Sequence, residues 1–323
     1  MNKRLYKIIF RLLLSVVIFI VIFKFIDVNS LIELFTKVGI ISILVYLVIY
    51  FCVYYVRALR FHILTEKKIS IIKWILISCI HGLYNRILPA RSGEASLLYY
   101  AKKIGNIETL NSLNILLVSR LSDLVSVIIL FLVALISSRD ALVVYPKVII
   151  ISLILVLMVL FILIKQLKKI LELSLSILKK ISVKVKLFNK LQKKLSNVRI
   201  DSIIKFSNKT LLQVFFISMI QWVILYFLFF VILRDINNAL SFSYVIIGSA
   251  YANISNLIPI SAIGGFGTME AGWILGFTIL GVNKASALFT GFTTNIVTFI
   301  LTIILGMVGI WTSKLYNKSK ENN

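Results

Sequence analysis

The chain has 323 residues, of which 60% are hydrophobic and 15% charged, and its mean hydropathy is +1.00. No soluble fold needs so apolar a composition, so the sequence predicts a polytopic membrane protein. The 36 Lys and Arg outnumber the 12 Asp and Glu, which gives a net charge of +24. These basic residues lie in loops beside apolar segments, as in cytoplasmic loops facing an anionic leaflet, and no nucleic-acid-binding module accompanies them.

The membrane segments are expected to be helices, which makes the fold class all-α. Apolar runs such as Leu12–Phe23 and Val148–Ile164 are continuous, whereas the strands of a membrane barrel alternate. The two cysteines and two histidines lack the spacing of a disulfide framework or a metal site, so we expect no metal and no cofactor.

Nine apolar segments are predicted in chain order. They are Ile8–Ile26, Gly39–Val56, Ile69–Leu88, Leu110–Ile136, Val143–Ile164, Leu211–Leu233, Phe242–Ile258, Met269–Leu280 and Ala285–Trp311. No alanine precedes Ala58, so no signal-peptide cleavage site follows the first segment, and we expect it to be a retained span.

The most basic stretch, Lys165–Lys209, divides the chain. It holds 13 Lys or Arg against two acidic residues, and should be cytoplasmic. Two interpretations stay open for it: an interfacial helix on anionic headgroups, or a solvated basic linker. The expected organisation is one transmembrane domain over residues 1–323, with a first half at 1–164, this basic segment at 165–209 and a second half at 210–323.

Parity determines the predicted topology. If the first five segments all crossed, a chain that starts inside would reach Lys165 on the outside, the wrong face for so basic a stretch. A re-entrant hairpin at Ile69–Leu88 restores the parity, whereas Phe242–Leu280 could be a hairpin or two full crossings. With two hairpins we expect about six full transmembrane helices in an inverted-repeat arrangement, with both termini cytoplasmic in an inner (cytoplasmic) membrane.

Two short motifs interrupt these segments, Asn85–Glu94 and Asn256–Glu270. Both share the order Asn, aliphatic pair, Pro, Gly, Glu, and their proline and glycines break the helix. Unpaired backbone groups at membrane depth are tolerated only when they are buried in protein or line a wet cavity. A matched pair of interrupted segments therefore points to a central binding site. The residues expected to shape the backbone there are Pro89, Gly93, Pro259, Gly264, Gly265 and Gly267.

Polar and charged residues near these breaks are the candidate substrate-binding set. They are Asn85, Arg86, Arg91, Glu94, Arg120, Asp123, Asn256, Ser261 and Glu270. A charge facing lipid costs about 3 kcal/mol at the bilayer centre, so we expect the ionised members to face a protein interior, a wet cavity or the interface. Arginine binds phosphate bidentately, which favours Arg86 and Arg91 as phosphate ligands; interfacial snorkelling is the alternative.

The remaining charged candidates each have two interpretations. Arg120 and Asp123 are three residues apart on one helix face, so they form a structural ion pair, or Asp123 orients Arg120 toward an anionic substrate. Glu94 and Glu270 follow Ser92 and Thr268, which are expected to be N-caps. The two carboxylates then serve helix capping alone, or the same helix N-termini also receive a phosphate.

The sequence resembles a known family at three places, the motifs Asn85–Glu94 and Ile258–Glu270 and the stretch Ser119–Asp123. The family is the transmembrane, flippase-like domain of lysyl-phosphatidylglycerol synthases and its stand-alone relatives. Its members commonly carry an acidic residue before the arginine, where this chain has Ser119. The resemblance implies the handling of anionic phospholipids or polyprenyl-phosphate glycolipids at a prokaryotic inner membrane. Aminoacyl transfer is not expected, because about a dozen residues follow Trp311, too few for the soluble synthase domain.

The leading hypothesis is a lipid flippase or transporter that is not an enzyme. Its partners would be an anionic phospholipid or lipid-linked substrate and the membrane, with no nucleic acid; a homo-oligomer or a partner synthase stays open. No nucleotide-binding loop is present, so we expect proton-coupled or passive transport. The alternatives are a non-transporting lipid-binding accessory subunit and an intramembrane enzyme of lipid modification; no HExxH, paired aspartate or Ser/His arrangement supports the enzyme.

Overall fold

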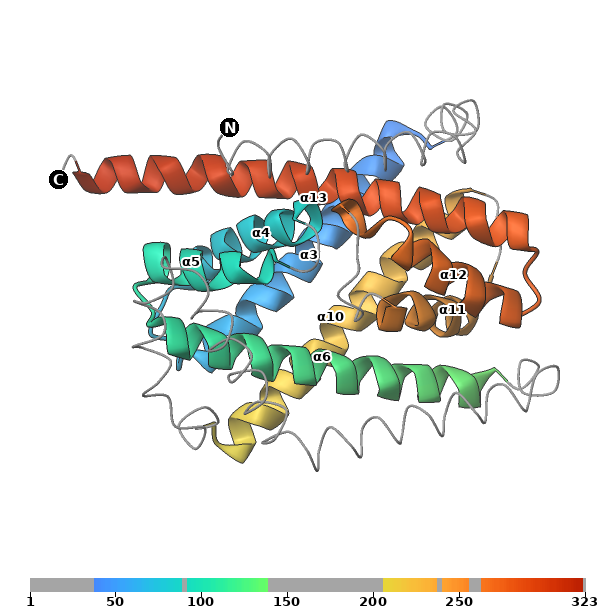
Figure 1. Ribbon diagram of the computed structural model, residues 1–323, viewed down its shortest axis with the longest axis horizontal. Helices are drawn as coiled ribbons and strands as arrows, with labels where there is room; N and C mark the ends of the chain where they lie inside the picture. Colours follow the sequence, from blue (N-terminus) through green and yellow to red (C-terminus); the bar gives the residue numbers. More distant parts are fainter. Residues whose placement is uncertain (1–37, 89–91, 139–205, 237–239, 256–262, 322–323) are drawn as a thin grey trace, which may run out of the picture.

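The computed structural model describes residues 38–88, 92–138, 206–236, 240–255 and 263–321, which form helices and contain no strand. The helices are α3 (Ile40–Leu64), α4 (Ile71–Ile87), α5 (Glu94–Gly105), α6 (Thr109–Ser137), α10 (Asn208–Asp235), α11 (Phe242–Ser255), the short 3-10 helix η3 (Ile263–Gly265), α12 (Thr268–Ile279) and α13 (Lys284–Glu321) (Figure 1).

Four of these helices are long and apolar enough to cross a membrane: α3, α6, α10 and the Lys284–Ser313 part of α13. The all-α prediction is therefore confirmed for the described residues, and the chain is a multi-pass membrane protein. The expected segments Ile8–Ile26 and Val143–Ile164 lie outside the described residues, as does the basic stretch up to residue 205.

The long helices form a frame around two pairs of short ones. α3 and α10 pack against each other and cross the middle of the molecule, while α6 and α13 run along its two sides (Figure 1). α4 packs on α5 at one end of the frame, and α11 packs on α12 at the other. Each pair contacts both side helices, so both halves of the chain share the order long helix, two short helices, long helix.

The first hairpin differs from its prediction. Ile69–Leu88 was expected to contain the whole hairpin, but α4 runs unbroken from Ile71 to Ile87, and the returning arm is α5. This arm begins with Glu94 and ends in a basic turn, so the apolarity of the sequence does not reveal it. The chain leaves α4 at Leu88, whose extended backbone (φ −87°, ψ 129°) suits the residue before a proline.

The second pair of short helices is held together by glycines. A Cβ added at Gly276 of α12 would lie 2.3 Å from the carbonyl oxygen of Gly248 on α11. The absent side chains let the two backbones approach closely, as small residues do between membrane helices. Trp273 and Phe277 of α12 are fully buried beside this contact and anchor the hairpin in the core formed with α6 and α10.

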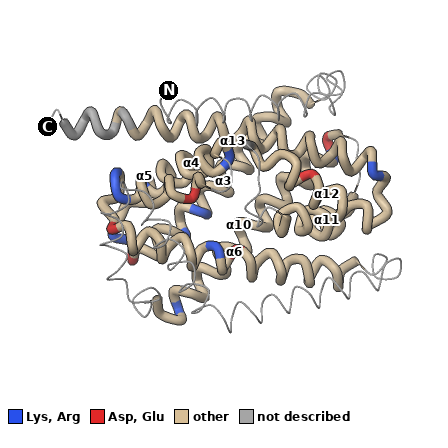
Figure 2. The backbone as a smooth tube through the Cα atoms, in the orientation of Figure 1, with Lys and Arg blue, Asp and Glu red and all other residues tan. Residues whose placement is uncertain are grey.

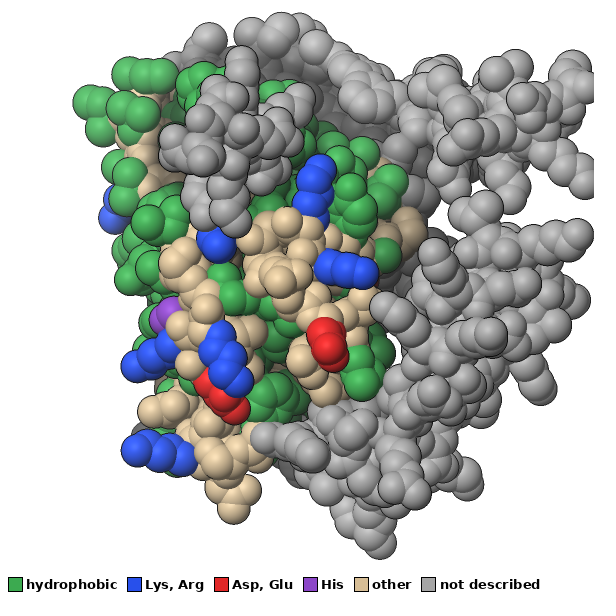
Figure 3. Space-filling model, turned by 90° about the vertical axis from the view of Figure 1, so that its left-hand side faces the viewer, with side chains coloured by type: hydrophobic (Ala, Val, Ile, Leu, Met, Phe, Trp, Pro, Cys, Tyr) green, Lys and Arg blue, Asp and Glu red, His purple; other side chains and the backbone are tan. Residues whose placement is uncertain are grey.

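The charged residues gather at one end of the frame. Exposed lysines surround the end where α3 and α5 finish and α6 and α10 begin, as Figure 2 and, in space-filling form, Figure 3 show. They include Lys67, Lys68, Lys102, Lys103 and Lys209. Charges are sparser at the opposite end, where Asp235 accepts a hydrogen bond of 2.7 Å from the Tyr46 hydroxyl. This bond joins the start of α3 to the end of α10, so the two central helices are antiparallel.

Candidate functional site

A cavity of about 220 Å³ lies where α3, α6 and α10 meet the inner ends of both hairpins. Its polar lining includes Arg57, Asn85, Arg86, Arg120, Asp123, Asn253 and Thr298. Its apolar lining includes Val53, Leu124, Val127, Leu225, Phe229 and Met269. A cavity with polar groups grouped among apolar and aromatic walls is typical of ligand-binding sites.

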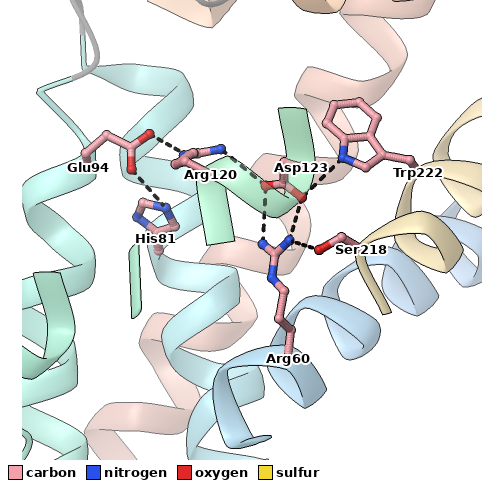
Figure 4. Close-up of polar contacts among 7 residues, drawn as sticks. All are labelled: Arg60, His81, Glu94, Arg120, Asp123, Ser218 and Trp222. Atoms are coloured by element: carbon pink, nitrogen blue, oxygen red, sulfur yellow. Dashed lines mark hydrogen bonds and ion pairs between the residues drawn. The ribbon is translucent and has the colours of Figure 1, made fainter. Parts of the chain in front are cut away.

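Asp123 of α6 joins three helices beside this cavity (Figure 4). Its two carboxylate oxygens accept hydrogen bonds from the two terminal nitrogens of Arg60. Arg60 lies on α3 and is only 2% exposed. Trp222 of α10 donates its indole N–H to Oδ1 at 3.1 Å, and Arg60 also donates to Ser218 Oγ at 2.8 Å. Buried charges of this kind are tolerated because each is paired and hydrogen-bonded.

Arg120 extends this arrangement toward the first hairpin. Its Nη2 donates to Glu94 Oε1, and its Nη1 lies 3.9 Å from Asp123 Oδ2, so the predicted Arg120–Asp123 pair is present and has a second carboxylate beside it (Figure 4). His81 Nε2 lies 3.9 Å from the other oxygen of Glu94. Glu94, Arg120, Asp123 and Arg60 thus form a row of alternating charges, which we call the charged row.

Arg86 connects the two hairpins. Its Nη1 donates to the carbonyl oxygen of Gly264 and to Asn295 Oδ1, both at 2.7 Å, and its Nη2 donates to Thr298 Oγ1 at 3.1 Å. Its guanidinium is therefore occupied by three neutral acceptors, two of them on α13. The forked shape of arginine suits such a divided set of acceptors.

Glu270 is 2% exposed and closes the second break. Its Oε2 accepts the backbone N–H of Gly267 at 2.7 Å, and its Oε1 accepts Asn295 Nδ2 at 2.7 Å. The carboxylate therefore caps α12 and also supports the asparagine that holds Arg86. Capping alone does not describe its contacts.

Both predicted N-caps differ from the structure. The N-cap residues are Gly93 and Gly267, and neither Ser92 nor Thr268 occupies that position. The glycines are needed for backbone reasons. A Cβ at Gly93 would lie 2.4 Å from the Cα of Asn85, and Gly267 has φ 88°, a conformation that L side chains rarely adopt. Gly264 and Gly265, also expected to shape the backbone, have φ values of 74° and 73°.

The structure brings together the predicted candidates that it describes. Asn85, Arg86, Arg120 and Asp123 line the cavity. Glu94 reaches it through Arg120, and Glu270 through Asn295 and Arg86. Five candidates lie outside the described residues: Pro89, Arg91, Asn256, Pro259 and Ser261.

Several residues of the site were missed from the sequence. Arg57 and Arg60 fall just beyond the second predicted segment, which ends at Val56; the helix continues to Leu64, so both arginines lie inside it. The apolar residues that follow them up to Leu64 were the available signal. Asn295 and Trp222 carry no signal in one sequence, since isolated polar or aromatic residues are common in membrane helices.

The family model described as lysylphosphatidylglycerol synthase TM region matches residues 8–306. The match covers nearly the whole chain and includes every residue of the cavity and of the charged row. Neither the curated proteins nor the solved structures contain a significant match to this chain. The family is one of membrane proteins in lipid metabolism or transport.

Proposed function

The chain belongs to the lysylphosphatidylglycerol synthase TM region family, and on this premise we propose that it is a lipid flippase or transporter. Its cargo would be an anionic phospholipid or a polyprenyl-phosphate-linked glycolipid, moved between the leaflets of a cytoplasmic membrane. The observation that carries the proposal is the cavity lined by arginines where the ends of two interrupted hairpins meet.

The proposed topology has the two hairpins entering from opposite faces. α5, α11 and α12 have 12, 14 and 12 residues, well below the roughly 20 that cross a bilayer. The lysine-rich end is the end at which α4 begins and α5 finishes. It would be cytoplasmic by the positive-inside rule. The α11–α12 pair opens at the other end, which gives an inverted repeat with the substrate site at its centre.

The lining of the cavity suits an amphipathic cargo. The side chain of Arg120 is 39% exposed, so its guanidinium can approach a phosphate while it stays paired with Glu94. The apolar walls can accept the first methylenes of acyl chains, the rest of which would remain in the bilayer. Arg86 and Arg91 add positive charge near the break in α4–α5, and Glu94, Asp123 and Glu270 balance charge or carry protons.

Reconstitution into liposomes tests the proposal. The purified chain should accelerate the leaflet exchange of a fluorescent phosphatidylglycerol, measured by dithionite quenching, and Arg120→Gln should reduce the rate by tenfold or more. Lys103→Gln is the matched control: it removes one positive charge over a tyrosine on the surface of α5, away from the cavity. No acceleration with phosphatidylglycerol or a polyprenyl-phosphate lipid would overturn the proposal, and co-purifying lipid in that case would favour an accessory subunit.

A further inference from the structure

Arg57 differs from the other arginines at the cavity in having no neutralising partner among the residues that the structure describes. Arg60 and Arg120 are paired with carboxylates, and Arg86 donates to three acceptors. Within the described part of the chain, Arg57 forms no ion pair; its contact is with the ring of Tyr54, whose centroid lies 5.0 Å from the guanidinium carbon. Both residues line the cavity. A half-buried cation without a counter-ion is costly in a membrane protein and marks a functional site.

The ring of Tyr54 holds Arg57 at the cavity. Tyr54 is 2% exposed, and it packs against Gly82 of α4, where an added Cβ would lie 2.2 Å from the tyrosine hydroxyl. The ring is therefore confined between α3 and α4. A guanidinium over a confined aromatic face is kept from turning away, and the ring offers no negative charge that a ligand would have to displace.

A second unsatisfied group belongs to a residue that lines the same cavity. The side-chain oxygen of Asn85 is buried and has no hydrogen-bond partner in the described residues, although Asn85 lines the cavity. A buried acceptor without a donor costs free energy until a ligand supplies one. The site thus lacks an anion at Arg57 and a hydrogen-bond donor at Asn85.

The charges at the cavity indicate the sign of the charge that the ligand carries. Among the described residues at the cavity and its hydrogen-bonded neighbours, the four guanidiniums of Arg57, Arg60, Arg86 and Arg120 face three carboxylates. These described residues leave an excess of positive charge, which favours an anionic group such as a phosphate. A cationic group on the headgroup of the ligand would be repelled by these guanidiniums. A hydroxyl group is therefore the hydrogen-bond donor that suits Asn85.

We propose that Arg57 is the principal phosphate contact of this site, and that its ligand is a phosphodiester lipid with an uncharged, hydroxylated headgroup whose hydroxyl donates to Asn85. The inference rests on the proposed function for the ligand being a membrane lipid; both a phosphatidylglycerol and a polyprenyl-phosphate-linked sugar carry such a phosphodiester. Arg120 then approaches the same phosphate as a secondary contact while it stays paired with Glu94, and Arg86 shapes the site because its donors are already engaged.

Binding and transport are measured on the same full-length preparations. Calorimetric titration in detergent uses dioctanoyl phosphatidylglycerol, dioctanoyl phosphatidic acid and the water-soluble headgroup glycerophosphoglycerol. We expect phosphatidylglycerol to bind more tightly than phosphatidic acid, and the free headgroup to bind weakly because it lacks the apolar part. Arg57→Gln should raise the Kd for phosphatidylglycerol by about tenfold or more, as for a lost charged hydrogen bond. Arg57→Lys should retain part of the affinity.

Two further variants guard against a folding artefact. Gly82→Ala keeps Arg57 but displaces the Tyr54 ring, and should also weaken phosphatidylglycerol binding; Lys103→Gln should leave the Kd unchanged. Wild-type affinity in Arg57→Gln, or tighter binding of phosphatidic acid than of phosphatidylglycerol, would overturn the inference. If phosphatidylglycerol binds through Arg57 and no leaflet exchange is seen, the proposed function fails and the binding site stands. If exchange occurs and Arg57→Gln leaves it unchanged, the binding site fails and the function stands.

Discussion

The guanidinium of Arg86 donates a hydrogen bond of 2.7 Å to the carbonyl oxygen of Gly264, 178 residues away in the sequence. The first residue lies at the end of α4 and the second in η3, so the bond joins the inner ends of the two hairpins. Gly264 has φ 74° and its carbonyl belongs to a break between helices. The interruption in one half of the chain is therefore stabilised by the other half.

Replacing Arg86 with lysine should loosen this junction. The lysine ammonium group has one nitrogen, whereas the arginine guanidinium donates from two separate terminal nitrogens. Lysine therefore cannot bond Gly264, Asn295 and Thr298 together. We expect hydrogen–deuterium exchange of the amides at 263–268 to become about tenfold faster or more, measured by mass spectrometry. Arg234→Lys, at an arginine whose side chain is 67% exposed, should leave these amides unchanged. Unaltered exchange in Arg86→Lys would show that other contacts hold the second break.

Removing Asp123 alone should be costly, because it leaves Arg60 charged and buried. We expect Asp123→Leu to lower the free energy of unfolding by about 3–5 kcal/mol, the range for breaking a buried ion pair. The double variant Arg60→Met, Asp123→Leu should recover most of that loss, since both charges are then gone. The measurement is a double-mutant cycle on unfolding in mixed micelles.

The comparison for this cycle is the exposed pair of Glu66 and Lys68, in which both side chains are 75% exposed. Glu66→Gln should leave unfolding unchanged, because water and salt screen a surface pair. A double variant no more stable than Asp123→Leu would mean that Trp222 and Arg120, and not the charge of Arg60, create the need for the carboxylate.

A methyl group at Gly276 should separate the arms of the second hairpin. The added Cβ would lie 2.3 Å from a backbone oxygen of α11, which cannot move as a side chain can. We expect Gly276→Ala to lower the free energy of unfolding by about 1–3 kcal/mol, as overpacking does. Gly39→Ala provides the control, because no atom lies within 4 Å of its Cβ position. Equal stability of the two variants would contradict the close approach of α11 and α12.

Glu270→Gln should disturb Arg86 through Asn295. Each oxygen of Glu270 accepts one hydrogen bond, from Gly267 N–H or from Asn295 Nδ2. In glutamine an NH₂ group replaces one of these oxygens, so this NH₂ donor faces one of the two donors and that donor loses its acceptor. If Asn295 turns its amide to adapt, its oxygen leaves Arg86. We expect a loss of about 1–3 kcal/mol in the free energy of unfolding, as for a buried unsatisfied donor. We also expect a cycle with Asn295→Ala to show coupling; additive effects would mean that Glu270 only caps α12.

Local patterns in the sequence predicted much of this fold. The continuous apolar runs identified α3, α6, α10 and α13, because a helix that crosses lipid must be apolar over its whole length. Proline and glycine at Asn85–Glu94 and Asn256–Glu270 marked the two breaks. The three-residue spacing of Arg120 and Asp123 predicted their pairing, since neighbours at that spacing share a helix face.

The tertiary structure alone decided which partner each charge has. Arg60 meets Asp123 across 63 residues and Arg120 meets Glu94 across 26, contacts that depend on how helices pack and that have no local signature. It also separated Arg57, which forms no ion pair with any residue that the structure describes, from Arg86, which donates three hydrogen bonds. The physical reason is the distance over which each requirement acts. Lipid requires each membrane-spanning segment to be apolar by itself, and this requirement is visible in the local sequence. The pairing of buried charges, in contrast, depends on distances between helices that one sequence does not contain.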